Sequence, residues 1–291
     1  MQITRFLIGA GLGVGMLGFS FAQGQGKDKG KAVVEPDAKV LYKEVGDVKL
    51  HLHVFKPEGM KEGEKRPGIV FFFGGGWNGG TPSQFYPHAE YLAKRGMVAI
   101  SAEYRVKSRN KTTPKECVMD GKSAIRWVRA NAGKLGIDAD KLAAGGGSAG
   151  GHVAAATALT TKFEEASDDK KVSCMPGALV LFNPVYDNGP ENGYGYDRVK
   201  EYWKDISPRH NISEKAPPTI VFLGSKDRLI PVSVAEGYKK EMEAKGRRCD
   251  LHVYEGQTHG FFNKNKSPEH FKLTVKEMDK FLVSLGYLEK K

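Results

Sequence analysis

The sequence predicts an α/β domain in which helices cover both faces of a mostly parallel central sheet. Three observations support this prediction. Short apolar runs of strand length alternate along the chain with longer segments of helical periodicity. Most of these runs are continuous, as expected for strands that are covered on both faces. Finally, 40% of the 291 residues are hydrophobic, which suffices for one large core.

The first residues are set apart from this domain. A single basic residue, Arg5, precedes an uncharged apolar stretch over 6–21, and Ser20-Phe21-Ala22 has the small residues of a cleavage site. This order is typical of a secretory signal peptide over 1–22, and it predicts a secreted or periplasmic protein. A retained membrane anchor is the alternative. We disfavour it and expect no stable anchor, because the stretch is short and contains five glycines.

Residues 23–35 are rich in Gly and Lys, and we interpret them as a flexible lead-in to one catalytic domain over 36–291. An opening hairpin is expected over 40–45 and 48–55, because apolar and polar residues alternate there. Continuous apolar runs then predict buried strands, and one-sided apolar patterns predict helices. In chain order these are a strand over 68–73, a helix over 87–95, a strand over 97–102, a helix over 114–134, a strand over 142–145 and an Ala-rich helix over 150–160.

The second half of the chain continues the alternation. Strands are predicted over 178–182, 219–223 and 251–254, and helices over 232–245 and 271–285. In an open parallel sheet, ligands bind beyond the carboxyl ends of the strands. The loops that directly follow these strands are therefore where reactive side chains are expected.

Composition excludes several classes of function. The formal net charge is +11, but no basic stripe alternates with aromatic residues, so no nucleic-acid partner is expected. Three cysteines allow at most one disulfide, and sequence alone leaves the pairing of Cys117, Cys174 and Cys249 open. None of them has the spacing of a metal site. We predict neither a metal nor an organic cofactor, because the serine chemistry that the motifs below indicate needs neither. The oligomeric state is left open.

The turn Gly146-Gly147-Ser148-Ala149-Gly150 follows the predicted strand over 142–145. It matches the G-x-S-x-G nucleophile elbow, in which a strained strand-to-helix turn exposes the serine hydroxyl. Small neighbours let the backbone turn tightly, and the N-terminus of the following helix favours developing negative charge. His152 lies close behind, and we interpret it as structural because the general base of this arrangement comes from a later loop.

A glycine-rich loop, Gly74-Gly75-Gly76-Trp77, follows the strand over 68–73. Its bare backbone offers amide donors of the kind that stabilise an oxyanion. Extended to Gly79, the loop also fits G-x-G-x-x-G, with Glu103 at the end of the next strand, as in a dinucleotide-dependent oxidoreductase. That reading is a remote alternative, because residues 78–82 would break the helix that must begin within the glycines.

Two later loops provide an acid and a base. Asp227 follows the strand over 219–223, and His259 follows the strand over 251–254. The chain order Ser148, Asp227, His259 is the order of nucleophile, acid and base in α/β-hydrolases. Because each residue lies just past the carboxyl end of a strand, the three side chains can converge. We expect Ser148 to attack, His259 to accept its proton and Asp227 to orient His259.

Together these motifs resemble the α/β-hydrolase esterases related to hormone-sensitive lipase and to small secreted carbohydrate acetyl esterases. The resemblance implies an α/β-hydrolase fold and an oxyanion hole made by the amides of Gly75, Gly76 and Ala149. The segments that support it are Phe73-Gly74-Gly75-Gly76-Trp77, Glu103-Tyr104-Arg105, Asp120 with Ala124 and Trp127, the turn around Ser148, Asp227 with Pro231, and His259-Gly260-Phe261-Phe262.

The chain departs from the family pattern in two places. Phe73 stands where the family usually has a His that braces the glycine loop, so we expect Phe73 to brace it by packing. The region before the sheet is too short for the helical cap of the lipase-like relatives, which implies a minimal cap. The insertion over 184–218 is rich in Tyr, Asn and Gly, and an open aromatic site would suit a sugar. Alternatively, these aromatic residues pack the loop against the core.

The predicted function is that of a serine carboxylesterase acting on short-chain acyl esters, above all acetyl esters, of a small molecule or a saccharide. A small-amide hydrolase or peptidase on the same fold is the main alternative. A non-catalytic binding module is a third hypothesis, disfavoured because Ser148, Asp227 and His259 are all present.

Overall fold

The computed structural model describes residues 34–191 and 193–290. The predicted signal peptide and nearly all of the predicted lead-in lie outside these residues. Among the helices of the described part, none has the length and apolar character needed to cross a membrane. The fold below is that of the predicted catalytic domain.

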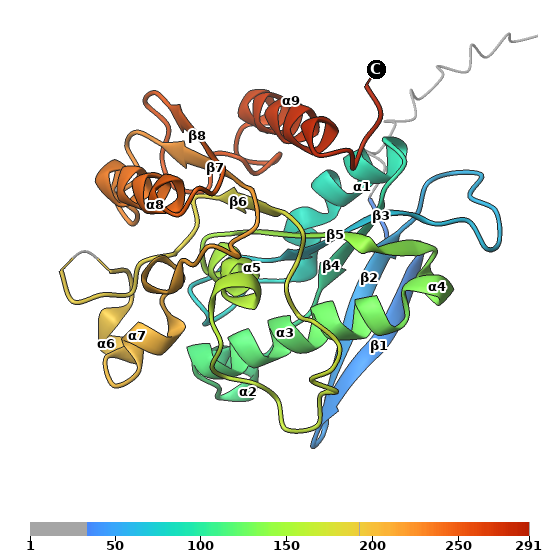
Figure 1. Cartoon of the computed structure of the whole chain (residues 1–291), viewed down its shortest axis with the longest axis horizontal. Helices are drawn as coiled ribbons and strands as arrows, with labels where there is room; N and C mark the ends of the chain where they lie inside the picture. Colours follow the sequence, from blue (N-terminus) through green and yellow to red (C-terminus); the bar gives the residue numbers. More distant parts are fainter. Residues whose placement is uncertain (1–33, 192, 291) are drawn as a thin grey trace, which may run out of the picture. The chain divides into compact units, whose positions relative to one another are not determined.

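The described chain forms an eight-stranded sheet with the order β1-β2-β4-β3-β5-β6-β7-β8 (Figure 1). β1 pairs antiparallel with β2, and β2 pairs antiparallel with β4. All pairs from β4 through to β8 are parallel, which confirms the predicted sheet. The strands are β1 (Ala38–Val45), β2 (Val48–Phe55), β3 (Arg66–Phe72), β4 (Val98–Ala102), β5 (Ile137–Gly147), β6 (Leu179–Phe182), β7 (Thr219–Gly224) and β8 (Cys249–Tyr254).

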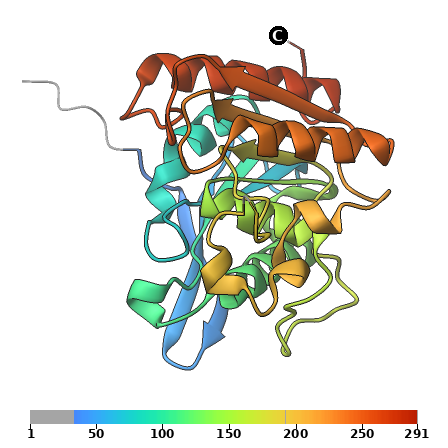
Figure 2. The same ribbon diagram turned by 90° about the vertical axis from the view of Figure 1, so that its left-hand side faces the viewer.

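Helices cover both faces of the sheet. One core cluster joins strand residues to α3 (Pro114–Ala130), α5 (Ala149–Leu159) and α8 (Val232–Ala244). The opposite cluster joins strand residues to α1 (Tyr86–Lys94) and α9 (Pro268–Ser284). Figure 2 shows the β1–β2 hairpin (blue) and α9 (red) at opposite ends of this domain.

The apolar run of β3 is continuous because helices cover both faces of this strand. Val70 and Phe72 belong to the cluster beneath α3 and α5, whereas Ile69 and Phe71 belong to the cluster beneath α1 and α9. Because side chains alternate between the two faces of a strand, a strand covered on both faces needs apolar residues at every position.

Several element boundaries differ from the prediction. The helix predicted over 114–134 divides at Asn131 into α3 and the short α4 (Ala132–Leu135), because the Asn131 side chain donates to the Trp127 carbonyl at 2.9 Å. β5 begins at Ile137, five residues before the predicted strand, since a polar stretch conceals its first half. The prediction missed the short helices η1 (Pro82–Phe85), α2 (Lys107–Asn110), α6 (Tyr196–Val199), α7 (Trp203–Ile206) and η2 (Arg209–Asn211).

The cysteine pairing that the sequence left open is resolved. All three cysteines are free thiols, with Cys117 and Cys249 buried and Cys174 half-buried. A domain of this size obtains its stability from its core and does not need a disulfide.

Candidate active site

Ser148 occupies the sharp turn between β5 and α5. Its backbone has φ 52° and ψ −120°, a strained conformation for a residue with a side chain. The neighbouring glycines have no room for a Cβ: at Gly146 it would lie 2.4 Å from the Gly150 carbonyl oxygen, and at Gly150 it would lie 2.0 Å from the Phe72 carbonyl oxygen. The small residues of the motif are therefore a steric requirement of the turn.

The structure brings the three predicted reactive side chains into one hydrogen-bonded row. Ser148 Oγ lies 2.9 Å from His259 Nε2, and His259 Nδ1 lies 2.7 Å from Asp227 Oδ2. The Asp227 side chain is fully buried, while 23% of the His259 side chain is exposed. The three residues follow β5, β8 and β7, so the parallel strands deliver them to the same edge of the sheet (Figure 1).

The surroundings of Asp227 determine which nitrogen of His259 holds the proton. Asp227 Oδ1 accepts hydrogen bonds from the backbone N–H groups of Leu229 at 2.8 Å and Ile230 at 3.0 Å, which fixes the carboxylate plane. The other oxygen faces His259 Nδ1 and can only accept, so Nδ1 holds the proton. Nε2 is thereby left as the acceptor for the Ser148 hydroxyl.

The loop of His259 is anchored by a residue that the sequence analysis missed. Asn183, buried just past the end of β6, accepts from the Gly260 N–H at 2.8 Å. Its Nδ2 atom lies 3.5 Å from His259 Nε2. Asn183 follows a predicted strand, so the rule that directed attention to Asp227 and His259 could have identified it as well.

The glycine loop passes directly against the nucleophile. A Cβ at Gly74 would lie 2.9 Å from the Gly147 carbonyl oxygen and 3.3 Å from Ser148 Cβ. Gly75, Gly76 and Trp77 all have positive φ, which turns their peptide groups sharply. Within the described residues, the backbone N–H groups of Gly75, Gly76 and Ala149 have no acceptor. Three unused amide donors beside Ser148 could hold an oxyanion.

Phe73, which departs from the family pattern, packs at the base of this loop. Its ring stacks on Tyr104 with the centroids 4.2 Å apart, and the Tyr104 hydroxyl donates to the Phe73 carbonyl at 2.6 Å. A Cβ at Gly80 would lie 2.6 Å from the Phe73 ring. The Phe73 ring therefore supports the glycine loop by packing against Tyr104 and Gly80, and the hydrogen bond from Tyr104 fixes the Phe73 carbonyl.

His152 has contacts that suit a structural residue. It is fully buried, its Nδ1 atom accepts from Trp77 Nε1 at 3.3 Å, and its Nε2 atom lies 3.0 Å from the Ile206 carbonyl oxygen. Burial lowers the pKa of His152 to about 4, so it is neutral at physiological pH. It holds Trp77 of the glycine loop against the insertion.

The structure does not favour the dinucleotide alternative. The glycine loop leads into η1 at Pro82, and α1 begins only at Tyr86, so no helix starts within the glycines. The Glu103 carboxylate is engaged by His51 and His53 at 3.1 and 3.2 Å. In the part of the chain that the structure describes, no group of three His, Cys, Asp or Glu side chains could hold a metal ion.

The aromatic residues of the insertion divide into two groups. Tyr186 is fully buried and stacks on Tyr238 with the centroids 4.6 Å apart, so it packs the loop against the core. Trp203 instead lines a cavity of about 430 Å³ together with Asp187, Arg209 and His210. This cavity also touches the first turn of α8, next to the loop of Asp227.

Comparisons with known proteins find relatives of this chain among esterases. Residues 52–179 match the BD-FAE family model. The chain is similar to esterase LipC of Mycobacterium tuberculosis, with 31% identity over 215 residues that cover 67% of this chain and 53% of LipC. It is also similar to the probable carboxylic ester hydrolase LipM of that organism, with 30% identity over 71% of this chain and 51% of LipM. The chain thus spans about half the length of these curated relatives.

Solved structures of esterase 2 from the planctomycete Thermogutta terrifontis resemble the chain over nearly their full length. The propionate-bound structure is 41% identical, with a TM-score of 0.83, and the match covers 87% of this chain and 96% of that chain. The same esterase phosphorylated by paraoxon is 42% identical over the same shares. The similarity extends over most of the fold described above.

Proposed function

The chain belongs to the α/β-hydrolase esterases of the hormone-sensitive-lipase-like group, and from that membership we propose that it hydrolyses carboxylic esters through Ser148, His259 and Asp227. The observation that supports this most is the unbroken row of hydrogen bonds from Ser148 Oγ through His259 to Asp227. The row lies beside three amides that have no other acceptor within the described residues.

The proposed reaction follows from this geometry. Ser148 Oγ attacks the ester carbonyl carbon while His259 Nε2 takes the hydroxyl proton, and Asp227 stabilises the imidazolium. The amides of Gly75, Gly76 and Ala149 bind the oxyanion of the tetrahedral intermediate. His259 then returns the proton to the departing alcohol. Water repeats the sequence on the acyl-serine, releasing the acid and restoring Ser148.

The acyl group in this proposal is short, with acetyl foremost. Solved structures of Thermogutta terrifontis esterase 2 are described as propionate-bound and butyrate-bound, which supports a site for short acyl chains in a protein of this family. The alcohol in the proposal is a saccharide or another small molecule. The cavity that Trp203 lines with Asp187, Arg209 and His210 supports a sugar, because sugars bind through aromatic faces and polar side chains.

A substrate panel tests the reaction and the acyl preference together. The panel compares p-nitrophenyl acetate, butyrate and octanoate with the matching anilides, and Ser148→Ala is the control. We expect acetate and butyrate to be hydrolysed fastest, anilides to react far more slowly and Ser148→Ala to lose at least about 10³-fold in kcat. Faster cleavage of anilides than of esters would contradict the esterase assignment and indicate an amidase. Acetate release from acetylated xylan tests the saccharide, and its absence would contradict that part.

We also propose that the protein is exported, on the evidence of Arg5 and the apolar stretch over 6–21. N-terminal sequencing of the protein from its native host checks this. The expected first residue is Gln23, and a mature protein that begins at Met1 would contradict export by cleavage.

A further inference from the structure

Two side-chain amides connect the glycine loop to the histidine loop. Gln84 Oε1 accepts from the Gly74 N–H at 2.6 Å, and Gln84 Nε2 donates to Asn263 Oδ1 at 3.0 Å. Asn263 Nδ2 then donates to the Gly260 carbonyl at 2.8 Å. We call this pair the Gln84–Asn263 bridge. It spans 179 positions in the sequence and joins the residue before Gly75 to the residue after His259.

Only one orientation of the two amides satisfies the bridge. The Gly74 N–H can only donate, so Gln84 must present its oxygen there, and its NH₂ group must face Asn263. The Gly260 carbonyl can only accept, so Asn263 must present its NH₂ group there and its oxygen to Gln84. Both ends therefore impose the same direction. Hydrogen bonds that run head to tail also polarise and strengthen one another.

We propose that Gln84 and Asn263 are positioning residues that fix the glycine loop relative to His259, an inference that rests on the proposed function. The glycine loop needs such a support because Gly74, Gly75 and Gly76 have no side chains with which to pack. Phe73 holds the base of the loop but has no polar atom for the Gly74 amide. The bridge provides that hydrogen bond from outside the loop.

The bridge acts where a small displacement matters most. Gly74 lies against Ser148 and immediately precedes Gly75 and Gly76, whose amides have no acceptor among the residues that the structure describes. A shift of a few tenths of an ångström there would move the Gly75 and Gly76 amides away from the developing oxyanion. That contact strengthens in the transition state, so its loss lowers kcat more than it raises KM. Gln84 and Asn263 are half-buried, so their replacement should affect folding only mildly.

The first test replaces each residue of the Gln84–Asn263 bridge with an apolar side chain of similar size that cannot form these hydrogen bonds. For Gln84→Met and Asn263→Leu we expect kcat for p-nitrophenyl acetate to fall about 10- to 100-fold with KM within about 3-fold, a loss comparable to that of a weakened oxyanion donor. Because the two residues act as a unit, the double variant should be no slower than the slower single variant. Additive losses would contradict the bridge.

The second test uses the direction of the bridge. In Gln84→Glu the carboxylate still accepts from Gly74, but its other oxygen faces Asn263 Oδ1, and rotating Asn263 only moves the repulsion to the Gly260 carbonyl. A protonated carboxyl can donate and restores the bridge. The ratio of variant to wild-type kcat, measured as acetate release, should therefore rise as pH falls toward about 4.3, the ordinary pKa of a glutamic acid. A ratio that does not depend on pH would overturn the proposal.

Tyr91→Phe is the matched control. It removes a side-chain hydrogen bond of 2.9 Å to Asp279, between α1 and α9 and away from the catalytic loops. We expect wild-type kcat and a slightly lower Tm. If the Gln84 variants keep kcat within about 2-fold of wild type, or if Tyr91→Phe loses as much kcat as they do, the bridge has no positioning role. A wild-type protein inactive on the whole ester panel would instead contradict the proposed function.

Discussion

The side chain of His88 is a polar group that lies in the hydrophobic core among aromatic rings. It is fully buried, and within the described chain neither ring nitrogen has a hydrogen-bond partner. Its ring lies 4.8 Å from Phe271, 5.0 Å from Phe85 and 5.0 Å from Phe182 between ring centroids. Burial among these rings lowers the pKa of His88 to about 3. The folded protein therefore keeps His88 neutral across the physiological range.

This burial predicts a loss of stability in acid. An unfolded histidine has a pKa of about 6.5, so between that value and about 3 the unfolded chain binds a proton that the folded chain excludes. The contribution of neutral His88 to the stability of the fold is therefore complete above pH 6.5 and decreases as pH falls. At pH 5 the decrease is about 2 kcal/mol. The test measures the free energy of unfolding in urea at pH 7 and at pH 5. The decrease between these two pH values should be about 2 kcal/mol smaller in His88→Phe than in wild type, because the variant has no imidazole to protonate on unfolding.

His252→Gln is the control for this measurement, because His252 lies half-buried on β8 and is not one of the aromatic residues that surround His88. It should keep the pH dependence of the wild type. Equal decreases in His88→Phe and wild type would show that His88 does not titrate on unfolding as described.

At the scale of single residues, the sequence predicts what has a motif and misses what has none. Ser148 was recognisable because its neighbours must be small, and His259 because it follows a strand in the required chain order. Gln84 and Asn263 belong to no pattern, since an amide in a loop has no periodicity and its partner is distant in sequence. Their pairing depends on two loops meeting in space, which only the structure reveals.

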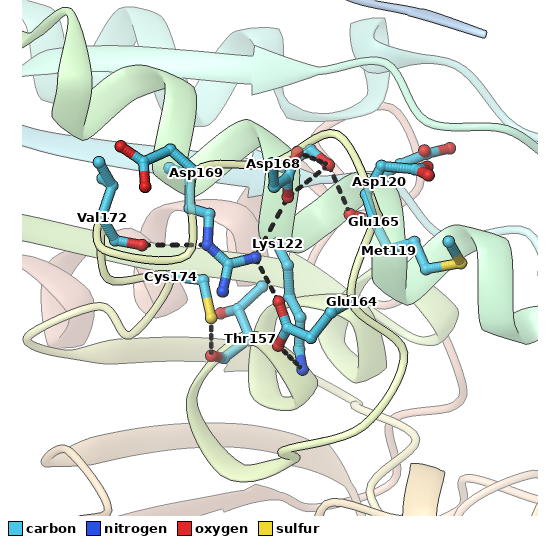
Figure 3. Close-up of polar contacts among 12 residues, drawn as sticks. Met119, Asp120, Lys122, Thr157, Glu164, Glu165, Asp168, Asp169, Val172 and Cys174 are labelled. Carbon is cyan, nitrogen blue, oxygen red and sulfur yellow. Dashed lines mark hydrogen bonds and ion pairs between the residues drawn. The ribbon is translucent and has the colours of Figure 1, made fainter.

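Among the elements, the segment over 160–178 has no regular secondary structure and is attached to α3 by buried ion pairs (Figure 3). Lys122, whose side chain is fully buried, donates to the carbonyls of Thr160 at 2.9 Å and Lys162 at 2.6 Å. It also pairs with Glu164 at 2.8 Å. One helical turn further along α3, Arg126 pairs with Asp168 at 3.1 Å. A row of cations on one helix thus holds a long loop in place.

Lys122→Met tests this attachment. The variant leaves two carbonyl groups and Glu164 without the ammonium, and breaking a buried pair in this way costs about 3 kcal/mol. This cost lies at the lower end of the range for breaking a buried ion pair. We expect the lower end because Glu164 is 24% exposed and keeps its contact with Arg126. The exposed pair Lys239–Glu243 is the comparison, and Lys239→Met should cost less than about 0.5 kcal/mol. Similar losses in both variants, measured by urea unfolding, would contradict this account.

Elements with continuous apolar runs were predictable, and those without them were not. β3, β6 and β7 are buried on both faces and could be located from sequence. The first half of β5 contains Asp138, Asp140 and Lys141, and it pairs with β3 through Ile137, opposite Arg66, before the register shifts to Leu142. The short helices of the insertion span three or four residues each, too few for a periodic signal.

For the whole molecule, the order of the strands explains why distant residues meet. β3 and β5 are neighbours, which places the glycine loop beside Ser148. β7 and β8 are neighbours, which places Asp227 beside His259. β6 lies between the two pairs, and Asn183 at its end holds the His259 loop through the Gly260 N–H. The sequence predicts that the site lies at the carboxyl ends of the strands, but this lateral order is a property of the assembled sheet.

The central claim is that Ser148 is a nucleophile activated by His259, and covalent labelling with paraoxon tests it most directly. Esterase 2 of Thermogutta terrifontis is described as phosphorylated by paraoxon, so the reagent suits a relative of this fold. We expect one phosphoryl group per chain, located on Ser148 by peptide mass mapping, together with release of one equivalent of p-nitrophenol and loss of ester hydrolysis. Ser148→Ala should take up none. Labelling of a different residue, or equal labelling of Ser148→Ala, would contradict the account.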